Sequence, residues 1–342
     1  MKTLYLHIGI HKTGSSSIQG FLSGNSELLE KENYYYPKEG SYYHPVAKSQ
    51  APLSMMLLGK ELYYLRNIPL TKIKCIQDIK KDIQQSISEN VVVSSEHFRG
   101  LKNLDQIIEL KNIFLPIVDN IKVLVYLRRQ DLAFESEWSQ NIKNGAKTLS
   151  FDDYLDGEIV FAERGYDRFD YSTLLNNFAQ VFGADNLIVR LFEKGQLHQG
   201  CVVLDFLMQI GVKQGNYSIE RLNESPSIEH LEVIRSIVGK IESREARKAF
   251  IQLIKAIPLN FDETKYSLFS NEARMAYLSR FKDSNAMVAK SFLNRDDGVL
   301  FYEPCQNSYP VYPGLSNERM SEISEAIFSF LGYSRSIKNE SE

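Results

Sequence analysis

A loop near the N-terminus carries the residue types that bind anions. It reads Gly9-Ile10-His11-Lys12-Thr13-Gly14-Ser15-Ser16-Ser17. Residues 2–8 form an apolar, alternating run that predicts a strand before it, and Ile18, Phe21 and Leu22 recur after it at helical spacing. Free backbone N–H groups at a helix start, together with the helix dipole, favour phosphate or sulfate. The junction therefore predicts an anion site.

The loop differs from the triphosphate-binding P-loop in the position of its lysine. Gly9 and Gly14 have the GxxxxG spacing, but Ser15 and Ser16 stand where that motif has lysine followed by a hydroxyl residue. The lysine is Lys12, ahead of the second glycine, where it suits a shorter anion than a triphosphate. Three consecutive serine hydroxyls add donors for the anion oxygens. No metal is expected, because the usual magnesium ligands are missing from their places.

A second strand-to-helix junction carries an arginine and a hydroxyl. Residues 121–127 form a nearly continuous apolar run, typical of a buried parallel strand. Arg128 follows directly, and Ser136 comes eight residues later within the next helical pattern. An arginine fork with a hydroxyl suits a phosphate monoester.

A third buried run, residues 91–93, is followed closely by Glu96 and His97. In P-loop-type sheets this strand lies beside the first strand, so its carboxyl end faces the anion loop, where ligands collect. Either side chain could deprotonate a hydroxyl group. Glu96 is the preferred base, His97 is the second candidate and His44 a third.

Taken in this order and at these spacings, the three features resemble the sulfotransferases that use 3′-phosphoadenosine 5′-phosphosulfate (PAPS), in their bacterial form. Stretches at 182–190, 222–227 and 281–285 are similar to bacterial members as well. The resemblance implies that the phosphosulfate is bound by His11, Lys12, Thr13, Gly14, Ser15, Ser16 and Ser17. It also implies that Arg128 and Ser136 hold the 3′-phosphate, with Lys12, Glu96 and His97 as catalytic residues.

The implied reaction is in-line transfer of a sulfuryl group from PAPS to an acceptor hydroxyl, on a carbohydrate or glycolipid. Lys12 would stabilise the leaving group, and Glu96 would act as base. Two alternatives stay open. A small-molecule kinase of P-loop type would use ATP and magnesium, and it predicts a lysine after Gly14 that the sequence lacks. A non-catalytic nucleotide-binding module would keep Arg128 and tolerate loss of the base.

Alternating strands and helices predict the fold class: a doubly wound parallel sheet of P-loop nucleotide-hydrolase type, with a mainly helical C-terminal third. The predicted strands are 3–8, 33–37, 91–95, 122–128 and 186–192. The predicted helices are 15–31, 72–87, 104–117, 131–144, 171–182, 200–210, 228–241, 243–256, 271–292 and 318–331. We expect one sulfotransferase-like domain over 1–342, with the PAPS site in an α/β core of 1–195 and a helical part of 196–342 packed on that core.

Composition limits the possible partners. The 342 residues include 40 basic and 43 acidic side chains, so overall charge gives no support to a nucleic-acid or anionic-membrane partner. The three cysteines are too widely spaced for a disulfide framework or a zinc site. No run of 18 apolar residues predicts a transmembrane segment. A functional loop at Gly9 would leave no room for a signal peptide, so we expect a cytoplasmic, bacterial enzyme.

An aromatic segment at 34–66 allows two interpretations. Its tyrosines and His44 either form a platform for the acceptor or bury their rings and leave the hydroxyls wet.

Overall fold

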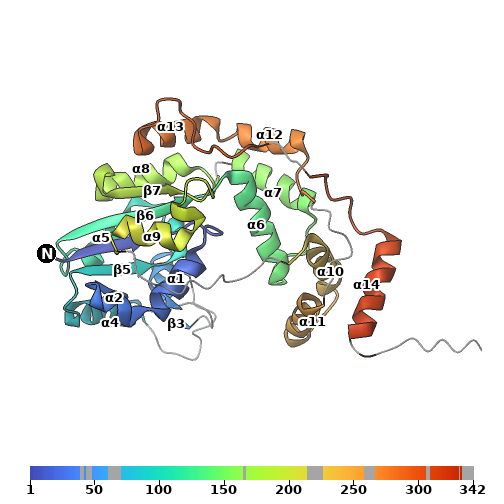
Figure 1. The fold of residues 1–342 in the computed structure, drawn as a ribbon, viewed down its shortest axis with the longest axis horizontal. Helices are drawn as coiled ribbons and strands as arrows, with labels where there is room; N and C mark the ends of the chain where they lie inside the picture. The colour runs from blue at the N-terminus through green and yellow to red at the C-terminus, as the bar shows by residue number, and fades with distance from the viewer. Residues whose placement is uncertain are drawn as a thin grey trace, which may run out of the picture. The chain divides into compact units, whose positions relative to one another are not determined.

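The computed structural model describes most of the chain (Figure 1). The described residues are 1–38, 42–43, 48–60, 71–164, 167–213, 226–257, 266–305, 309–330 and 332, with only the backbone given for 42, 43 and 48. His44 and the stretch 222–225, which the sequence analysis singled out, lie outside them.

The chain divides into two compact units, each made of three chain segments. Unit 1 comprises Met1–Ala133, Phe169–Leu222 and Ser279–Pro304. Unit 2 comprises Phe134–Arg168, Asn223–Leu278 and Cys305–Glu342. The expectation that a helical part packs on the α/β core stays a prediction.

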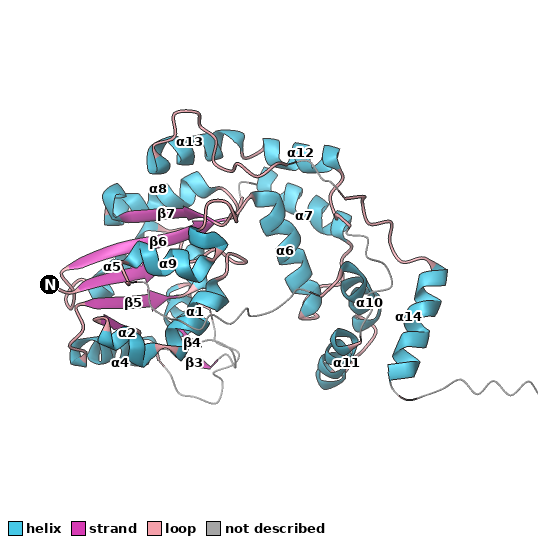
Figure 2. Cartoon of the chain, in the orientation of Figure 1, coloured by secondary structure: helices cyan, strands magenta, loops and turns pink. Residues whose placement is uncertain are grey.

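Unit 1 is built on a five-stranded sheet in which every pairing is parallel (Figure 2). In the order of the sheet, its strands are β2 (Tyr34–Tyr35), β5 (Asn90–Ser94), β1 (Thr3–His7), β6 (Asn120–Leu127) and β7 (Leu187–Leu191). Each predicted strand is therefore present. At the carboxyl edge, His7 of β1 lies opposite Ser94 of β5 and Leu124 of β6, so the three chemically marked segments leave neighbouring strands.

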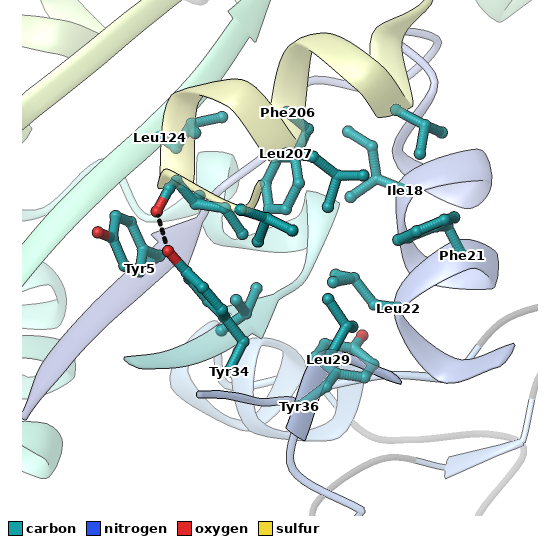
Figure 3. Packing of buried hydrophobic residues seen from close by; sticks show 14 of the residues in the cluster. Tyr5, Ile18, Phe21, Leu22, Leu29, Tyr34, Tyr36, Leu124, Phe206 and Leu207 are labelled. Carbon is teal, nitrogen blue, oxygen red and sulfur yellow. Dashed lines mark hydrogen bonds between the residues drawn. The ribbon is translucent and has the colours of Figure 1, made fainter. Parts of the chain in front are cut away.

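Helices cover both faces of this sheet. Alternate side chains of a strand point to opposite faces, and Val92 and Leu124 pack with α1 and α9 on one face (Figure 3). Leu6, Val93 and Val125 are also fully buried, so the other face is covered as well. There α5 and α8 contact each other, and α8 contacts β6 and β7. The helices of unit 1 are α1 (Ser15–Gly24), α2 (Ser26–Lys31), α3 (Ala51–Leu57), α4 (Lys72–Gln85), α5 (Leu104–Phe114), α8 (Tyr171–Phe182), α9 (Val202–Ile210) and α13 (Lys282–Leu293). The described ranges of this unit also contain a short antiparallel pair, β3 (Tyr42–Tyr43) with β4 (Lys48–Ser49), and the 3₁₀ turns Glu96–Gly100, Ala184–Asn186 and His198–Gly200.

Three tyrosines of the aromatic segment belong to the core. The rings of Tyr34, Tyr35 and Tyr36 are all buried. The Tyr34 hydroxyl donates to the carbonyl of Ile210 at 2.6 Å (Figure 3), and that of Tyr35 donates to Asp82 at 2.6 Å. The interpretation as an acceptor platform is therefore wrong for these three residues, because their rings face the protein interior.

The last segment of unit 1 is fastened to the sheet edge by two buried charged side chains. Arg129 donates to the carbonyls of Glu303 and Pro304 at 2.8 and 2.9 Å. The carboxylate of Glu193 accepts from the backbone N–H groups of Tyr302 and Glu303, both at 3.0 Å. These bonds tie chain near residue 300 to the ends of β6 and β7.

Unit 2 is helical in its described part. Its helices are α6 (Gln130–Lys143), which starts in unit 1, α7 (Phe151–Glu163), α10 (Ile228–Val238), α11 (Arg244–Ala256), α12 (Asn271–Ser279) and α14 (Asn317–Phe330). Phe134, Phe151 and Phe269 form an aromatic core, with ring centroids of adjacent pairs 4.8 to 6.1 Å apart. The mainly helical C-terminal third is thus confirmed for the described residues.

Candidate functional site

The two loop glycines stand where the chain bends and where other segments come very close. Gly9 has φ +53°, and a Cβ atom there would lie 2.9 Å from the Cα of Glu96. Gly14 has φ +79°, and its Cβ would lie 2.7 Å from Cγ1 of Val202 on α9. Only glycine tolerates both the left-handed backbone and these contacts. The two glycines therefore allow the loop to lie in close contact with the end of β5 and with α9.

The first turn of α1 is open to an anion. Gly14 is the N-cap residue, so no side chain caps this helix. The Gly14 carbonyl accepts from the N–H groups of Ser17 and Ile18, at 2.9 and 3.0 Å. Within the described part of the chain, the N–H groups of Thr13, Ser15 and Ser16 donate to nothing. Such unsatisfied donors at a helix start bind phosphate and sulfate oxygens.

The loop hydroxyls differ in what they can offer to a ligand. The buried Thr13 hydroxyl donates to the Ile10 carbonyl at 2.6 Å, so this side chain shapes the loop. Ser15 is 3% exposed, and its buried hydroxyl has no hydrogen-bond partner in the described structure. Ser16 is exposed and Ser17 half-buried. An unpartnered buried hydroxyl is costly unless something binds it, which makes Ser15 the serine that fits an anion ligand best.

Arg128 is hydrogen-bonded to the anion loop at Lys12. Its Nη1 donates to the Lys12 carbonyl at 2.8 Å, while Lys12 itself has the left-handed φ of 69°. The guanidinium lies 5.6 Å from the ring centroid of Phe192, and the Tyr171 hydroxyl donates to the Arg128 carbonyl. Arg128 and Lys12 thus lie next to each other, and the ligand-binding roles predicted for them stay predictions. Ser136 lies on the part of α6 that belongs to unit 2, and its pairing with Arg128 stays a prediction.

The end of β5 brings a carboxylate and two imidazoles together. Glu96 begins the 3₁₀ turn Glu96–Gly100, and its Oε1 lies 3.1 Å from Nδ1 of His11. The rings of His11 and His97 meet edge to face, with centroids 5.4 Å apart. Ser95 orients the turn by accepting from the His97 N–H at 3.3 Å. The anion loop and the predicted base positions therefore form one cluster.

Burial and charge act in opposite directions on Glu96. Burial by itself would raise the pKa of this carboxyl, but the hydrogen bond from His11 and the charges of His11, His97 and Arg99 outweigh it and lower the pKa to about 2. Burial lowers the pKa of His97, an effect that Glu96 opposes and the cations Lys60 and Arg99 reinforce. At neutral pH Glu96 is therefore ionised and His97 is neutral.

A buried polar group beneath the loop was not anticipated from the sequence. His7, the last residue of β1, is fully buried, and its Nδ1 lies 2.8 Å from the Ser94 hydroxyl. Gln19 donates to the same hydroxyl at 3.1 Å. Burial lowers the pKa of His7 to about 4, against an opposing effect of Glu96. The sequence does contain a signal for this group, because the polar residues His7 and Gln19 occupy buried positions of a strand and a helix. An apolar pattern alone does not account for polar residues at such positions.

The described residues lack both a metal-binding cluster and a membrane-spanning helix. These residues contain no group of three or more His, Cys, Asp or Glu side chains able to hold a metal ion. None of their helices combines the length and apolar character that a membrane crossing requires. The three cysteines, Cys75, Cys201 and Cys305, are unbridged.

Comparison with known proteins gives few matches. No protein-family model matches the chain. An uncharacterized protein of Archaeoglobus fulgidus is 28% identical over 218 residues, which make up 62% of this chain and 56% of the relative, so the chain spans little more than half of that relative's length. A crystal structure of a sulfotransferase from Alicyclobacillus acidocaldarius is similar, with a TM-score of 0.44 and 16% identity over 74% of this chain and 96% of that one. A likeness at this level carries no argument about function.

Proposed function

We propose that the chain is a sulfotransferase that moves a sulfuryl group from PAPS to an acceptor hydroxyl on a carbohydrate or glycolipid. The observation that carries this proposal is the set of donors at the start of α1. Backbone N–H groups without acceptors and the unpartnered Ser15 hydroxyl lie in the same loop as Lys12. The residue after Gly14 is a serine, so the lysine of a triphosphate site is missing. These donors fit a phosphosulfate group.

The chemistry follows from the position of the charges. The acceptor oxygen attacks sulfur, the bond between sulfur and the bridging oxygen breaks, and its electron pair goes to the departing phosphate. Lys12 and the loop N–H groups stabilise the charge that develops there, an effect worth about 3 kcal/mol for each well-placed donor. The acceptor proton leaves toward the end of β5, where Glu96 and His97 lie.

Arg128 has a double role in this proposal. One guanidinium nitrogen holds the Lys12 carbonyl and thereby supports the left-handed loop backbone. Arginine has five N–H donors in a planar fork, so the group can also bind the 3′-phosphate of the donor nucleotide. Ser136 would add a hydroxyl to that phosphate site.

The test is calorimetric titration of the full chain with adenosine 3′,5′-bisphosphate, the product nucleotide, in the absence of magnesium. We expect saturable binding that weakens roughly 10–100-fold in Lys12→Ala and in Arg128→Ala, because each removes a charge-assisted contact worth about 1.5–3 kcal/mol. Lys81→Ala, which changes an exposed lysine of α4, is the matched control and should bind normally.

A parallel titration with ATP and magnesium separates the alternatives. Binding of ATP–magnesium with no binding of the bisphosphate would reject the sulfotransferase and favour the small-molecule kinase. Bisphosphate binding without release of the bisphosphate from PAPS, whatever hydroxyl compound is offered, would favour the non-catalytic module.

A further inference from the structure

Helix α3 packs against the end of β5 through buried hydrogen bonds. The hydroxyl of Ser54 on this helix lies 2.8 Å from the hydroxyl of Ser95. Gln50, the N-cap residue of α3, accepts from the Ser94 N–H at 2.8 Å. All four side chains are fully buried. The position of α3 relative to the end of β5 is therefore fixed by bonds that are shielded from water.

This packing brings Lys60 to the 3₁₀ turn Glu96–Gly100. The side chain of Leu58 lies against the last residue of the turn, where a Cβ atom added to Gly100 would be 3.2 Å from both methyl carbons. Leu58 is the C-cap residue of α3, and Lys60 follows two residues later with an exposed side chain. Burial lowers the pKa of His97 in this turn, and the charge of Lys60 lowers it further. The lysine therefore places a positive charge beside the turn.

Arg99 adds a second positive charge at the same place. It belongs to the turn itself and is half-buried. Burial raises the pKa of the Glu96 carboxyl and of the Tyr171 hydroxyl, and in both cases the charge of Arg99 acts against burial. The Tyr171 hydroxyl donates to the Arg128 carbonyl, so the charge of Arg99 reaches the ends of both β5 and β6.

The anionic groups of the donor have other partners in the proposed function. The phosphosulfate is assigned to the start of α1, and the 3′-phosphate is assigned to Arg128. The turn has one acidic side chain, Glu96, whose Oε1 is 3.1 Å from Nδ1 of His11. Lys60 and Arg99 therefore place positive charge at the end of β5, where the acceptor is expected to bind.

We infer that the acceptor is an acidic sugar, and that Lys60 and Arg99 bind its carboxylate or phosphate group while a neighbouring hydroxyl faces the end of β5. The inference rests on the proposed function and names the class of its acceptor. An arginine fork matches the geometry of a carboxylate and of a phosphate, and a lysine is a point charge for either. A neutral sugar would lack both contacts.

The test is calorimetric titration of the full chain, saturated with the bisphosphate, with two matched pairs of probes. Phenyl β-D-glucuronide and phenyl β-D-glucoside differ by a carboxylate, and glucose 6-phosphate and glucose differ by a phosphate. We expect the acidic member of at least one pair to bind about tenfold more tightly or better, the effect of a charge-assisted contact. The pair with the larger affinity ratio identifies the anion. This ratio should shrink as salt is added, because salt screens exposed charges.

Substitutions of the two cations should lower the affinity ratio. Lys60→Gln should lower it about 2–5-fold, the range for an exposed ion pair. Arg99→Gln should lower it about tenfold, because a hydrogen bond to a charged group contributes more when the group is half-buried. Arg99→Lys keeps the charge and should retain part of the ratio that Arg99→Gln loses. Lys81→Gln, which changes an exposed lysine of α4, is the matched control and should leave the ratio unchanged.

Three results would overturn the inference. The first is equal affinity for both members of each pair, or a ratio that neither Lys60→Gln nor Arg99→Gln changes. The second is the absence of binding by all four probes in a chain that binds the bisphosphate. The third is a Lys60→Gln variant that binds the bisphosphate more weakly at an unchanged ratio, because that result assigns Lys60 to the donor.

Failure of the proposed function gives a different result. A wild-type chain that binds no bisphosphate and does not consume PAPS rejects the sulfotransferase. The four probes, titrated without the bisphosphate, then still decide whether Lys60 and Arg99 bind an acidic sugar.

Discussion

Replacing Gly9 by alanine tests the contact on which the site is built. Gly9 has φ +53°, where an L residue costs about 1–2 kcal/mol, and the added methyl would lie 2.9 Å from both the Cα of Glu96 and the hydroxyl of Ser15. Backbone cannot move aside as a flexible side chain can, so overpacking should add about 1–3 kcal/mol. We therefore expect Gly9→Ala to lower the free energy of unfolding by about 2–5 kcal/mol.

Gly59 provides the matched control. It follows Leu58, the C-cap residue of α3, with φ +66°, and an added Cβ would meet nothing within 4 Å. Gly59→Ala should therefore show the backbone strain alone. Thermal unfolding followed by circular dichroism should separate the two variants by at least about 2–4 °C, which corresponds to about 1 kcal/mol in a unit of this size. Equal losses in the two variants would refute the claim that Gly9 is required by its contact with Glu96.

Three further predictions concern stability, pH and ligand affinity. Asp205→Ala should lower the free energy of unfolding by about 3–5 kcal/mol in urea denaturation, because Asp205 is fully buried and accepts from Arg190 at 2.9 Å; a loss below 1 kcal/mol would contradict a buried ion pair. His7 has a pKa of about 4 in the folded chain against about 6.5 when unfolded. The unfolded chain therefore binds more protons between those pH values, and the free energy of unfolding should fall by about 3 kcal/mol as the pH drops from 6.5 to 4. Denaturation at several pH values should show a shallower fall in His7→Gln than in wild type. An identical dependence of stability on pH in the two proteins would contradict the assignment to His7. Ser15→Ala should unfold at an unchanged or slightly higher temperature, since its hydroxyl has no partner, but bind the bisphosphate roughly 2–10-fold more weakly in calorimetry; unchanged affinity would exclude this hydroxyl as a ligand.

The sheet was predictable because its signals are local. Each strand is a short apolar run, and parallel strands buried on both faces must be apolar throughout. The loop was equally visible, since glycines and a lysine at a strand-to-helix junction lie within ten residues of one another. Helix α7 (Phe151–Glu163) was missed although Ser150 caps it by accepting from the Asp153 N–H. Its apolar pattern is interrupted, because the polar Glu158 is buried while Val160 and Phe161 are exposed.

The contacts within the site were not predictable, because they depend on where distant segments meet. The pair of His11 and Glu96 exists because β5 lies beside β1 in a register that puts Ser94 opposite His7. The bond from Arg128 to the Lys12 carbonyl requires β6 on the other side of β1 and a left-handed lysine. Sequence spacing marks the residue types, whereas register and loop conformation decide which of them touch.

The interleaving of the two units determines how the chain must reach its native state during synthesis. Unit 1 begins with β1 and is complete only when the segment that ends at Pro304 has joined it, through the bonds that Arg129 and Glu193 make to that segment. At about 5–20 residues per second, the ribosome needs on the order of ten to thirty seconds to add the chain between Ala133 and Pro304. Until the segment that ends at Pro304 has been made, the side chain of Arg129 cannot form its bonds to the carbonyls of Glu303 and Pro304, and the carboxylate of Glu193, once synthesised, cannot accept from the N–H groups of Tyr302 and Glu303.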